Sequence, residues 1–413
     1  MPATLTLRNA FLIDGSERSP QEAATIVVAD GRIREVGGPT THAPDGSRVI
    51  DCRGAAVIPG LIDAHVHIGA VDVDFGTQAR RKPTSLIAFE MARRLRRLLD
   101  LGYTTVRDCG GADWGFKAAV ASELIPGPDL VICSAMLSQT GGHGDMRQRA
   151  ELDEPGCCHA PFGMVFAIAD GSDAVRKAVR EQIRQGADFV KVMASGGAAS
   201  PTDKLDCVQY SPEELRLIVE EAHRADTYVA AHALPKVAIL QAVRAGVRTI
   251  EHGNFLDEES AKEMAEAGSA LIPTVATYVI ASRHPEKYSD PPEVVAKIGR
   301  AAEGALAAVE AAYRAGVTVG SGSDLLGDEL SWIGYEHQFR ADVVGAAGAI
   351  RAATAVNADI LGLSDVGRIE VDRRGDIVVL QGNPLEDISV LANPEKVLAV
   401  VKAGHVHLCS IPS

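Results

Sequence analysis

The middle of the chain, about residues 59–360, repeats one pattern: a short apolar run that ends in polar residues, then a stretch rich in Ala, Leu, Glu and Arg. Such a run predicts a buried parallel strand, and the stretch after it predicts a covering helix. Eight units favour a closed (β/α)₈ TIM barrel over an open doubly wound sheet. No G-x-G-x-x-G motif follows an early strand, which disfavours a dinucleotide-binding fold. The eight expected strands are 61–66, 104–107, 129–133, 188–192, 228–231, 248–251, 270–273 and 317–320.

The two ends of the chain have a different texture, with apolar and polar residues alternating between glycine turns. At the amino end, Asp14-Gly15 and Asp30-Gly31 separate short strands, and Ala403-Gly404 does so near the carboxyl end. Each end alone is too small to bury a core. We therefore expect residues 1–58 and 361–413 to pair into one small β-sandwich domain beside a barrel at 59–360.

Segment 135–170 is too long for a plain connection, and long connections in compact domains are usually functional or disordered.

Charge and composition exclude several partners. The chain has 41 Lys and Arg against 55 Asp and Glu, a formal net charge of −14, so it repels nucleic-acid backbones. The basic run 93–97 fits an amphipathic pattern, and we interpret it as the solvated face of a helix. No run approaches the ~18 apolar residues of a membrane span, and the amino end lacks a signal-peptide pattern. The seven cysteines are odd in number and scattered, which suits a reducing compartment, so we expect a cytoplasmic protein.

Polar residues capable of binding metal fall at the expected strand ends. In a barrel, the active site lies where the carboxyl ends of the strands meet. His65 and His67 are two apart, so both can face one metal. Imidazole and carboxylate are ligands of Zn²⁺ and similar cations. The sequence therefore predicts a metal site. The remaining candidate ligands, each at or near a later strand end, are Lys191, His232, His252 and Asp324.

Lys191 is the unusual member of this set. An ammonium is not a metal ligand, and a charged lysine inside a strand is costly unless it is paired. Carboxylation by CO₂ would convert it into a carbamate, an anion whose two oxygens can bridge two metals. We therefore expect two divalent ions, with Zn²⁺ as the first choice.

Each candidate also has a purely structural interpretation. A single histidine at a strand end is more often a packed or surface group than a ligand. His405-Val406-His407 has the same spacing as the first pair but lies in the expected β domain, so we interpret it as structural. His42 and His284 fall in loop-like sequence and are expected at the surface. The first pair differs because the other candidates accompany it at the same rim.

The motifs also resemble a known family. The segment 59–67, Pro-Gly-Leu-Ile-Asp-Ala-His-Val-His, looks like the first strand of the amidohydrolase superfamily, and the order of candidate ligands is similar to its binuclear branch. Segments 352–358, 375–380 and 383–385 resemble its return into the β domain. Within the superfamily, 139–145 and 190–197 look like the prolidase-like group, which includes Xaa-Pro dipeptidases, arginine carboxypeptidases and ochratoxin amidohydrolases.

The resemblance implies roles for these residues. His65, His67 and Asp324 would hold one metal, His232 and His252 the other, and carboxylated Lys191 with a hydroxide would bridge them. His143 and Tyr228 would contact the carbonyl or carboxylate of the substrate, although a turn histidine and simple packing remain the alternatives. Asp324 would take the proton of the attacking hydroxide and pass it to the leaving amine. The roles of two further residues stay open between binding a substrate carboxylate and surface charge: Arg147 and Arg149.

The functional prediction is hydrolysis of a C–N amide bond in a dipeptide, an N-acyl amino acid or a related small molecule. One alternative is a deaminase or cyclic-amide hydrolase on the same scaffold, although mononuclear deaminases do without a carboxylated lysine. Another is a non-catalytic scaffold protein, which would have no reason to keep six convergent polar groups. The substrate, the native metal and any homo-oligomer stay open.

Overall fold

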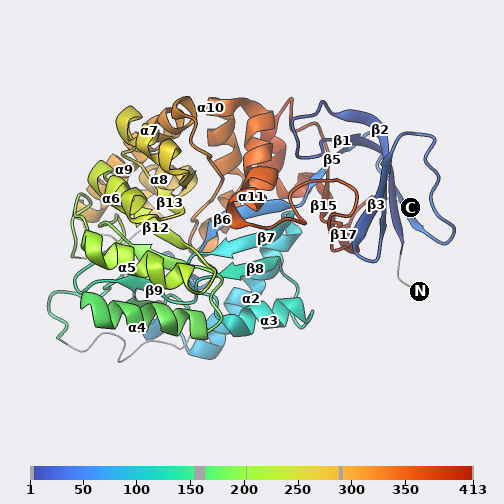
Figure 1. The fold of residues 1–413 in the computed structure, drawn as a ribbon. Helices are drawn as coiled ribbons and strands as arrows, with labels where there is room; N and C mark the ends of the chain where they lie inside the picture. Colours follow the sequence, from blue (N-terminus) through green and yellow to red (C-terminus); the bar gives the residue numbers. More distant parts are fainter. Residues whose placement is uncertain (1–3, 153–162, 201, 288–291, 412–413) are drawn as a thin grey trace.

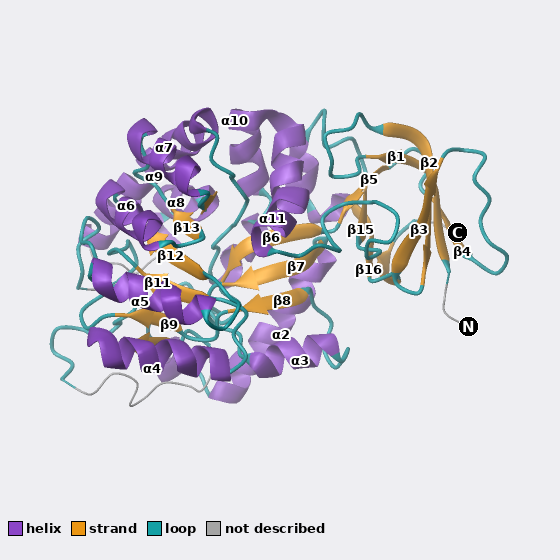
Figure 2. Ribbon diagram, in the orientation of Figure 1, coloured by secondary structure: helices purple, strands orange, loops and turns teal. Residues whose placement is uncertain are grey.

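Parallel strands wrapped by helices lie beside a separate sheet that contains strands from both ends of the chain (Figures 1 and 2). The computed structural model describes residues 4–152, 163–200, 202–287 and 292–411. No helix within these ranges is both long and apolar enough to cross a bilayer.

The terminal segments meet in one eight-stranded sheet, with the order β17-β16-β15-β5-β1-β2-β3 and β4 paired with β1. Antiparallel pairing of β5 with β15 joins the two ends, with Val57 opposite Val379. Its strands are β1 (Leu5–Leu12), β2 (Gln21–Ala29), β3 (Arg32–Gly37), β4 (Arg48–Asp51), β5 (Ala56–Pro59), β15 (Ile377–Leu380), β16 (Val397–Lys402) and β17 (His405–Cys409).

Two hairpins of this sheet turn where the sequence placed them. Asp30 and Gly31 have φ of 53° and 75° between β2 and β3. Ala403 and Gly404 have φ of 48° and 77° between β16 and β17. Two successive positive φ values give a turn whose twist matches that of the paired strands. The predicted pairing of the two ends of the chain is confirmed. The described strands form a single hydrogen-bonded sheet, and their arrangement as a β-sandwich stays a prediction.

The middle of the chain forms two parallel sheets, β6-β7-β8 and β10-β9-β11-β12-β13-β14. Helices cover the outside of these strands in Figure 2. Alternation of strand and helix brings the carboxyl ends of the strands to one side. The strands are β6 (Leu61–Val66), β7 (Tyr103–Asp108), β8 (Asp129–Ile132), β9 (Met136–Ser138), β10 (Phe166–Ile168), β11 (Val190–Met193), β12 (Val229–Ala233), β13 (Thr249–His252) and β14 (Ala270–Ile272).

Local sequence explains where the helices begin and end. Ser211 and Glu214 form a capping box at the start of α5, and Asp257 and Ser260 form one at the start of α7. Gly268 ends α7 in the left-handed conformation that glycine favours. The α-helices are α1 (Gln78–Arg81), α2 (Thr84–Asp100), α3 (Trp114–Ala121), α4 (Gly171–Arg184), α5 (Pro212–His223), α6 (Lys236–Ala245), α7 (Glu258–Ala267), α8 (Val275–Arg283), α9 (Pro292–Ala315), α10 (Tyr335–Arg351) and α11 (Asn357–Leu361).

The eighth expected strand, 317–320, is not a strand. It makes one isolated parallel bridge, between Val319 and Leu271 of β14. A side chain on Gly320 would meet the Asn357 Oδ1 atom at 2.4 Å, so this position requires glycine, a residue that weakens strands. The segment still reaches β6 through the Ser321 carbonyl, which accepts a bond of 3.0 Å from the Ala64 N–H.

The long segment 135–170 contains two strands that the sequence did not predict, β9 and β10. They pair in parallel, with Leu137 opposite Ala167. Each has three residues, too few to show an alternating pattern. Residues 153–162 of this segment, which include Cys157 and Cys158, lie outside the described residues. The described cysteines, 52, 109, 133, 207 and 409, are free.

Candidate metal centre

The predicted ligands come from five places in the fold and meet at one rim. His65 and His67 come from the end of β6, Lys191 from β11, His232 from β12 and His252 from the end of β13. Asp324 follows the segment that bridges to β14. All of them except His65 line one open cavity, which contains about 740 Å³ of space when the adjoining solvent is included. The fully buried His65 lies beneath it.

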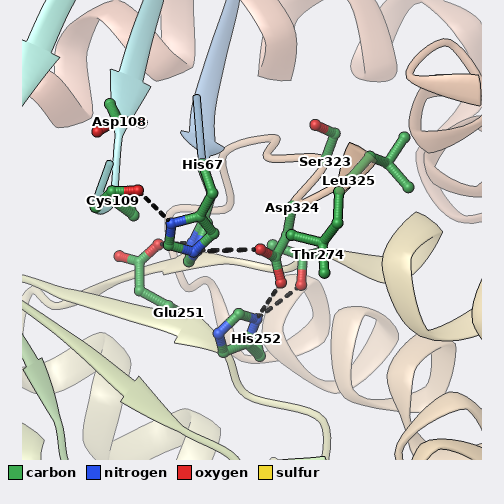
Figure 3. A network of polar contacts seen from close by, with 12 residues as sticks. His67, Asp108, Cys109, Glu251, His252, Thr274, Ser323, Asp324 and Leu325 are labelled. Atoms are coloured by element: carbon green, nitrogen blue, oxygen red, sulfur yellow. Dashed lines mark hydrogen bonds and ion pairs between the residues drawn. The ribbon is translucent and has the colours of Figure 1, made fainter. Parts of the chain in front are cut away.

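Three ligand atoms converge as a metal site requires. The His67 Nε2 atom lies 3.4 Å from the Asp324 Oδ1 atom, and the His65 Nε2 atom lies 3.7 Å from the same oxygen. Figure 3 shows His67 and His252 on two sides of the Asp324 carboxylate. One donor atom from each of His65, His67 and Asp324 lies within 4.8 Å of the other two. This grouping fits a divalent cation.

The two histidines of β6 are oriented by bonds at their other ring nitrogens. The His65 Nδ1 atom lies 2.6 Å from the Glu251 carboxylate, and the His67 Nδ1 atom lies 2.8 Å from the Gly110 carbonyl oxygen. Both partners are acceptors, so Nδ1 carries the proton and Nε2 keeps its lone pair. The buried His65 Nε2 atom has no hydrogen-bond partner among the described residues. A buried unpartnered imidazole nitrogen facing a carboxylate is the arrangement that a bound cation satisfies.

A second pair of imidazoles lies across the cavity. The ring centroids of His232 and His252 are 4.6 Å apart. The His252 Nδ1 atom is 2.7 Å from the Thr274 hydroxyl and 3.8 Å from the Asp324 Oδ2 atom (Figure 3). The His232 Nε2 atom donates a hydrogen bond to the Gly196 carbonyl at 3.2 Å. The Nδ1 atom of this ring then carries the lone pair that can bind a metal. The two carboxylate oxygens of Asp324 therefore face histidines on opposite sides.

The backbone is strained at two of the candidate ligands. His252 and Asp324 have φ of 70° and 54°. A non-glycine residue in this left-handed region costs of order 1–2 kcal/mol and persists where the surrounding structure enforces it. Both residues lie at positions where the chain leaves the strand layer. The strain therefore coincides with the candidate ligands.

Lys191 is nearly fully buried in β11 and lines the cavity. No hydrogen bond or ion pair joins its Nζ atom to a residue in the described ranges. A buried ammonium without an anionic partner is unfavourable. Conversion of the amine to a carbamate removes this problem, because it replaces the cation with an anion beside the candidate metal positions.

Burial shifts the pKa values of these groups toward their neutral forms. Burial raises the pKa of Asp324 to about 8, although the nearby Lys191 ammonium acts in the opposite direction. Burial, with a contribution from Lys191, lowers the pKa of His67 to about 3. The pKa of His65 and that of His252 are also lowered well below the usual range, mainly by burial. Neutral imidazoles are the form that binds metal, and a bound cation favours the ionised carboxylate.

A buried network of charged side chains, which the sequence did not reveal, holds His65 in place. The Glu251 carboxylate accepts bonds from the Arg107 Nη2 atom at 2.7 Å to each oxygen, besides its contact with His65. It also accepts a bond of 2.6 Å from the Thr249 hydroxyl. All three side chains are fully buried. The sequence contained one signal for this network: Arg107 and Glu251 are charged residues within the apolar runs 104–107 and 248–251.

Arg94 is a second residue whose role the sequence did not predict. Its position corrects the expectation that the whole basic run 93–97 is solvated. Arg93, Arg96 and Arg97 are exposed as expected, but Arg94 is buried. Its guanidinium donates to the backbone carbonyls of His67, Leu325 and Gly327. Helical periodicity turns one residue of the run inward, where it ties the end of β6 to the chain that follows Asp324.

His143 reaches the same cavity, and its ring stacks on that of His232 with centroids 4.3 Å apart. Tyr228 does not reach this cavity. It lies just before β12, at the amino end of the strand, where its ring stacks on Phe189 at 5.5 Å and the Arg248 guanidinium lies 4.8 Å above it. It lines a different cavity together with Arg248. The geometry therefore favours packing for Tyr228, the alternative that the sequence left open.

The two arginines of the long segment differ. Arg147 is paired with Asp145, with bonds of 2.8 Å from Nε and 2.7 Å from Nη2. Arg149 is exposed and lines an outer cavity that shares Phe75 and Met146 with the inner one. Of the two, Arg149 is therefore the better placed to meet a ligand that enters from outside.

The four histidines that the sequence analysis set aside lie elsewhere, as expected. The His407 Nε2 atom lies 2.7 Å from an Asp100 carboxylate oxygen, and His405 is exposed. His42 is exposed, and the His284 ring stacks on Trp332. None of these four lines the cavity of the candidate ligands.

Comparison with known proteins identifies the class to which this fold and site belong. Residues 56–407 match the model of the amidohydrolase family, so the chain belongs to that family, and the resemblance seen in its motifs is confirmed. It is 34% identical over 420 residues to ochratoxinase of Aspergillus niger, covering 97% of this chain and 86% of that protein.

Two solved structures extend the comparison. One, a prolidase in complex with N-methylphosphonate-L-proline, has a TM-score of 0.95 and 42% identity, covering 99% of this chain and 100% of the other. The second, a Xaa-Pro dipeptidase with bound methionine, has a TM-score of 0.88 and 28% identity, covering 98% and 100%. The predicted prolidase-like grouping is consistent with these relatives.

Proposed function

We propose that this amidohydrolase is a binuclear metal-dependent enzyme that hydrolyses the C–N amide bond of a dipeptide, an N-acyl amino acid or a related amide. The observation that carries the proposal is the convergence of three imidazoles, one lysine and one carboxylate on a single cavity, with the buried imidazole of His65 next to them. The relatives described above are named as a prolidase, a Xaa-Pro dipeptidase and an ochratoxinase. These names support an amide substrate for this chain.

We assign the ligands as the sequence suggested. His65, His67 and Asp324 would hold one ion, His232 and His252 the other, and carboxylated Lys191 would bridge them. Zn²⁺ is the proposed metal because the donors are imidazole and carboxylate. When bound, the two ions would polarise the scissile carbonyl and lower the pKa of a shared water toward neutrality.

The residues of the chain would supply proton transfer and positioning. Asp324 faces both histidine pairs, so its carboxylate is placed to accept a proton from the attacking water and return it to the leaving amine. His143 would bind the substrate beside His232. The outer wall of the cavity is apolar and would limit access of bulk water; it includes Phe75, Met136, Met146, Met164 and Phe166.

The alternatives are less well supported. A buried Lys191 that makes no hydrogen bond or ion pair within the described ranges is suited to conversion to a carbamate, which a mononuclear deaminase does not use. A non-catalytic scaffold would not need the strained backbone at His252 and Asp324. We therefore retain amide hydrolysis as the single proposed activity.

The finer architecture is also part of the proposal. Backbone bonds at both seams between the two parallel sheets support a closed (β/α)₈ barrel, one between Leu271 and Gly320 at 2.9 Å and one between Asp188 and Ile132 at 2.7 Å. We propose the division 1–58, 59–360 and 361–413, with the terminal parts forming a β-sandwich. We also propose a cytoplasmic location, from the scattered cysteines, and leave homo-oligomerisation open.

The test combines a substrate screen with one matched pair of variants. Zinc-loaded protein should hydrolyse members of a panel of dipeptides and N-acyl amino acids. Asp324→Asn keeps the size of the side chain and one coordinating oxygen but cannot accept the proton, so kcat should fall at least ~10²-fold. The control is Asp342→Asn, a change at an exposed carboxylate of α10, which should be neutral.

Metal content measured on the same preparations decides the outcome. A loss of kcat at full metal content supports Asp324 as the proton acceptor, and parallel loss of metal and activity makes it only a ligand. A fully metallated, fully active Asp324→Asn variant would remove it from the reaction. A content of one metal ion or none per fully active chain would contradict the binuclear assignment.

A further inference from the structure

The ring of His143 is held in one place beside the candidate metal ligands. One face stacks on His232. Gly197 packs against the ring, since a side chain there would place Cβ only 2.2 Å from the His143 Cε1 atom and would displace the ring. The His143 backbone N–H donates to the Gln209 Oε1 atom at 2.9 Å. The ring therefore has a defined position before any substrate arrives.

Two buried residues behind the ring form a hydrogen-bonded chain. The His143 Nδ1 atom lies 2.9 Å from the Ser200 hydroxyl, and that hydroxyl donates to the Asp203 Oδ1 atom. Ser200 is fully buried, and the Asp203 side chain is 2% exposed. The other carboxylate oxygen of Asp203 accepts bonds from the Gln209 amide at 3.0 Å and the Gly197 N–H at 3.2 Å.

The direction of this chain fixes the position of the imidazole proton. A hydroxyl has one proton, and the Ser200 proton goes to the Asp203 carboxylate, an acceptor only. The Ser200 oxygen must therefore accept from His143, which requires Nδ1–H. In the neutral ring, Nε2 then carries a lone pair, and no hydrogen bond joins it to a residue in the described part of the chain.

We propose that Ser200 and Asp203 are positioning residues that hold His143 as its Nδ1–H tautomer and make Nε2 a hydrogen-bond acceptor in the cavity. The neutral ring then recognises a donor on the substrate, an ammonium or amide N–H, instead of the carbonyl or carboxylate oxygen expected from the sequence. The recognition part of this inference rests on the proposed function, whereas the tautomer does not.

The first test reads the ring directly. Protein with ¹⁵N-labelled histidine should show His143 protonated at Nδ1, with its signals assigned by their absence in His143→Gln. Ser200→Ala removes the acceptor and should reduce the preference for Nδ1–H. Asp203→Asn can donate to the Ser200 oxygen and reverse the chain, so it should increase the Nε2–H form.

The second test measures recognition. Ser200→Ala should lower kcat/KM up to about tenfold for a substrate with a free ammonium, the scale of one lost hydrogen bond, with metal content unchanged. An analogue that lacks the donor should lose less. Ser200→Thr keeps the hydroxyl and should restore the tautomer and the selectivity. The matched control is Ser269→Ala, which removes a buried hydroxyl that donates to the Val247 carbonyl at the other end of the strands.

The outcomes separate the two claims. An Nε2–H ring in the wild-type protein overturns the inference outright. An equal loss for both substrates in Ser200→Ala overturns the recognition part. If the ring is Nδ1–H but no amide is hydrolysed, the positioning role stands and the proposed function fails.

Discussion

Replacing Glu251 with Gln should both destabilise the fold and weaken metal binding, because one carboxylate serves two partners. It accepts both bonds from the Arg107 Nη2 atom at 2.7 Å, and it holds His65 through a contact of 2.6 Å. Gln has nearly the same shape but no charge. The Arg107 guanidinium, which is fully buried, would then lack its anionic partner.

The magnitude follows from this geometry. At 2.7 Å and an effective dielectric constant of about 20, the attraction in the pair is roughly 6 kcal/mol. The amide oxygen of Gln retains part of it as a neutral acceptor. Breaking a buried ion pair from one side typically costs about 3–5 kcal/mol, and we expect a loss of that size in the free energy of unfolding. Loss of the carboxylate that orients His65 should also lower metal affinity about 10–100-fold.

The assay is urea unfolding of chelator-treated protein, with metal affinity measured separately by competition with a chelator. Glu181→Gln is the control, because its ion pair with Arg184 is exposed to solvent and should contribute little to stability. The double variant Arg107→Met/Glu251→Gln should recover part of the lost stability, since no buried charge remains unpaired. A loss below about 1 kcal/mol in Glu251→Gln, with unchanged metal affinity, would refute the argument.

Three further perturbations test separate parts of the site. Lys191→Ala should lose the second metal ion and most activity, with partial rescue by short carboxylic acids that occupy the place of the carbamate; full activity with an unmodified lysine would contradict this. His65→Gln should reduce metal content, whereas His407→Gln should not, because His407 lies in β17 of the terminal sheet and its ring contacts Asp100 at the end of α2; equal losses, measured by elemental analysis, would mean that the site is misplaced. Arg94→Met should cost about 2–3 kcal/mol of unfolding free energy by leaving buried carbonyls without donors, against about 0.5 kcal/mol or less for the exposed Arg93→Met; similar values from urea unfolding would refute the tie.

The sequence by itself determined the parts of this protein that depend on local pattern. Alternation and Gly turns were enough to place the Asp30-Gly31 and Ala403-Gly404 hairpins. Strand period and chemistry were enough to select His65, His67 and the later ligands, because a polar residue at the end of an apolar run stands out. The tertiary structure brings these side chains together, with all but His65 lining one cavity.

Local pattern did not determine which side chains share a buried contact across the fold. Glu251 and Arg107 are 144 residues apart, and each looked like an isolated charge in an apolar run. The side on which Arg94 lies depended on helix rotation against β6, and the place of Tyr228 depended on which end of its strand faces the site. The chain at 317–320 was misread as a strand because its glycine serves close packing against Asn357. Tertiary packing decided these points, since the contacts join segments whose proximity no local pattern records.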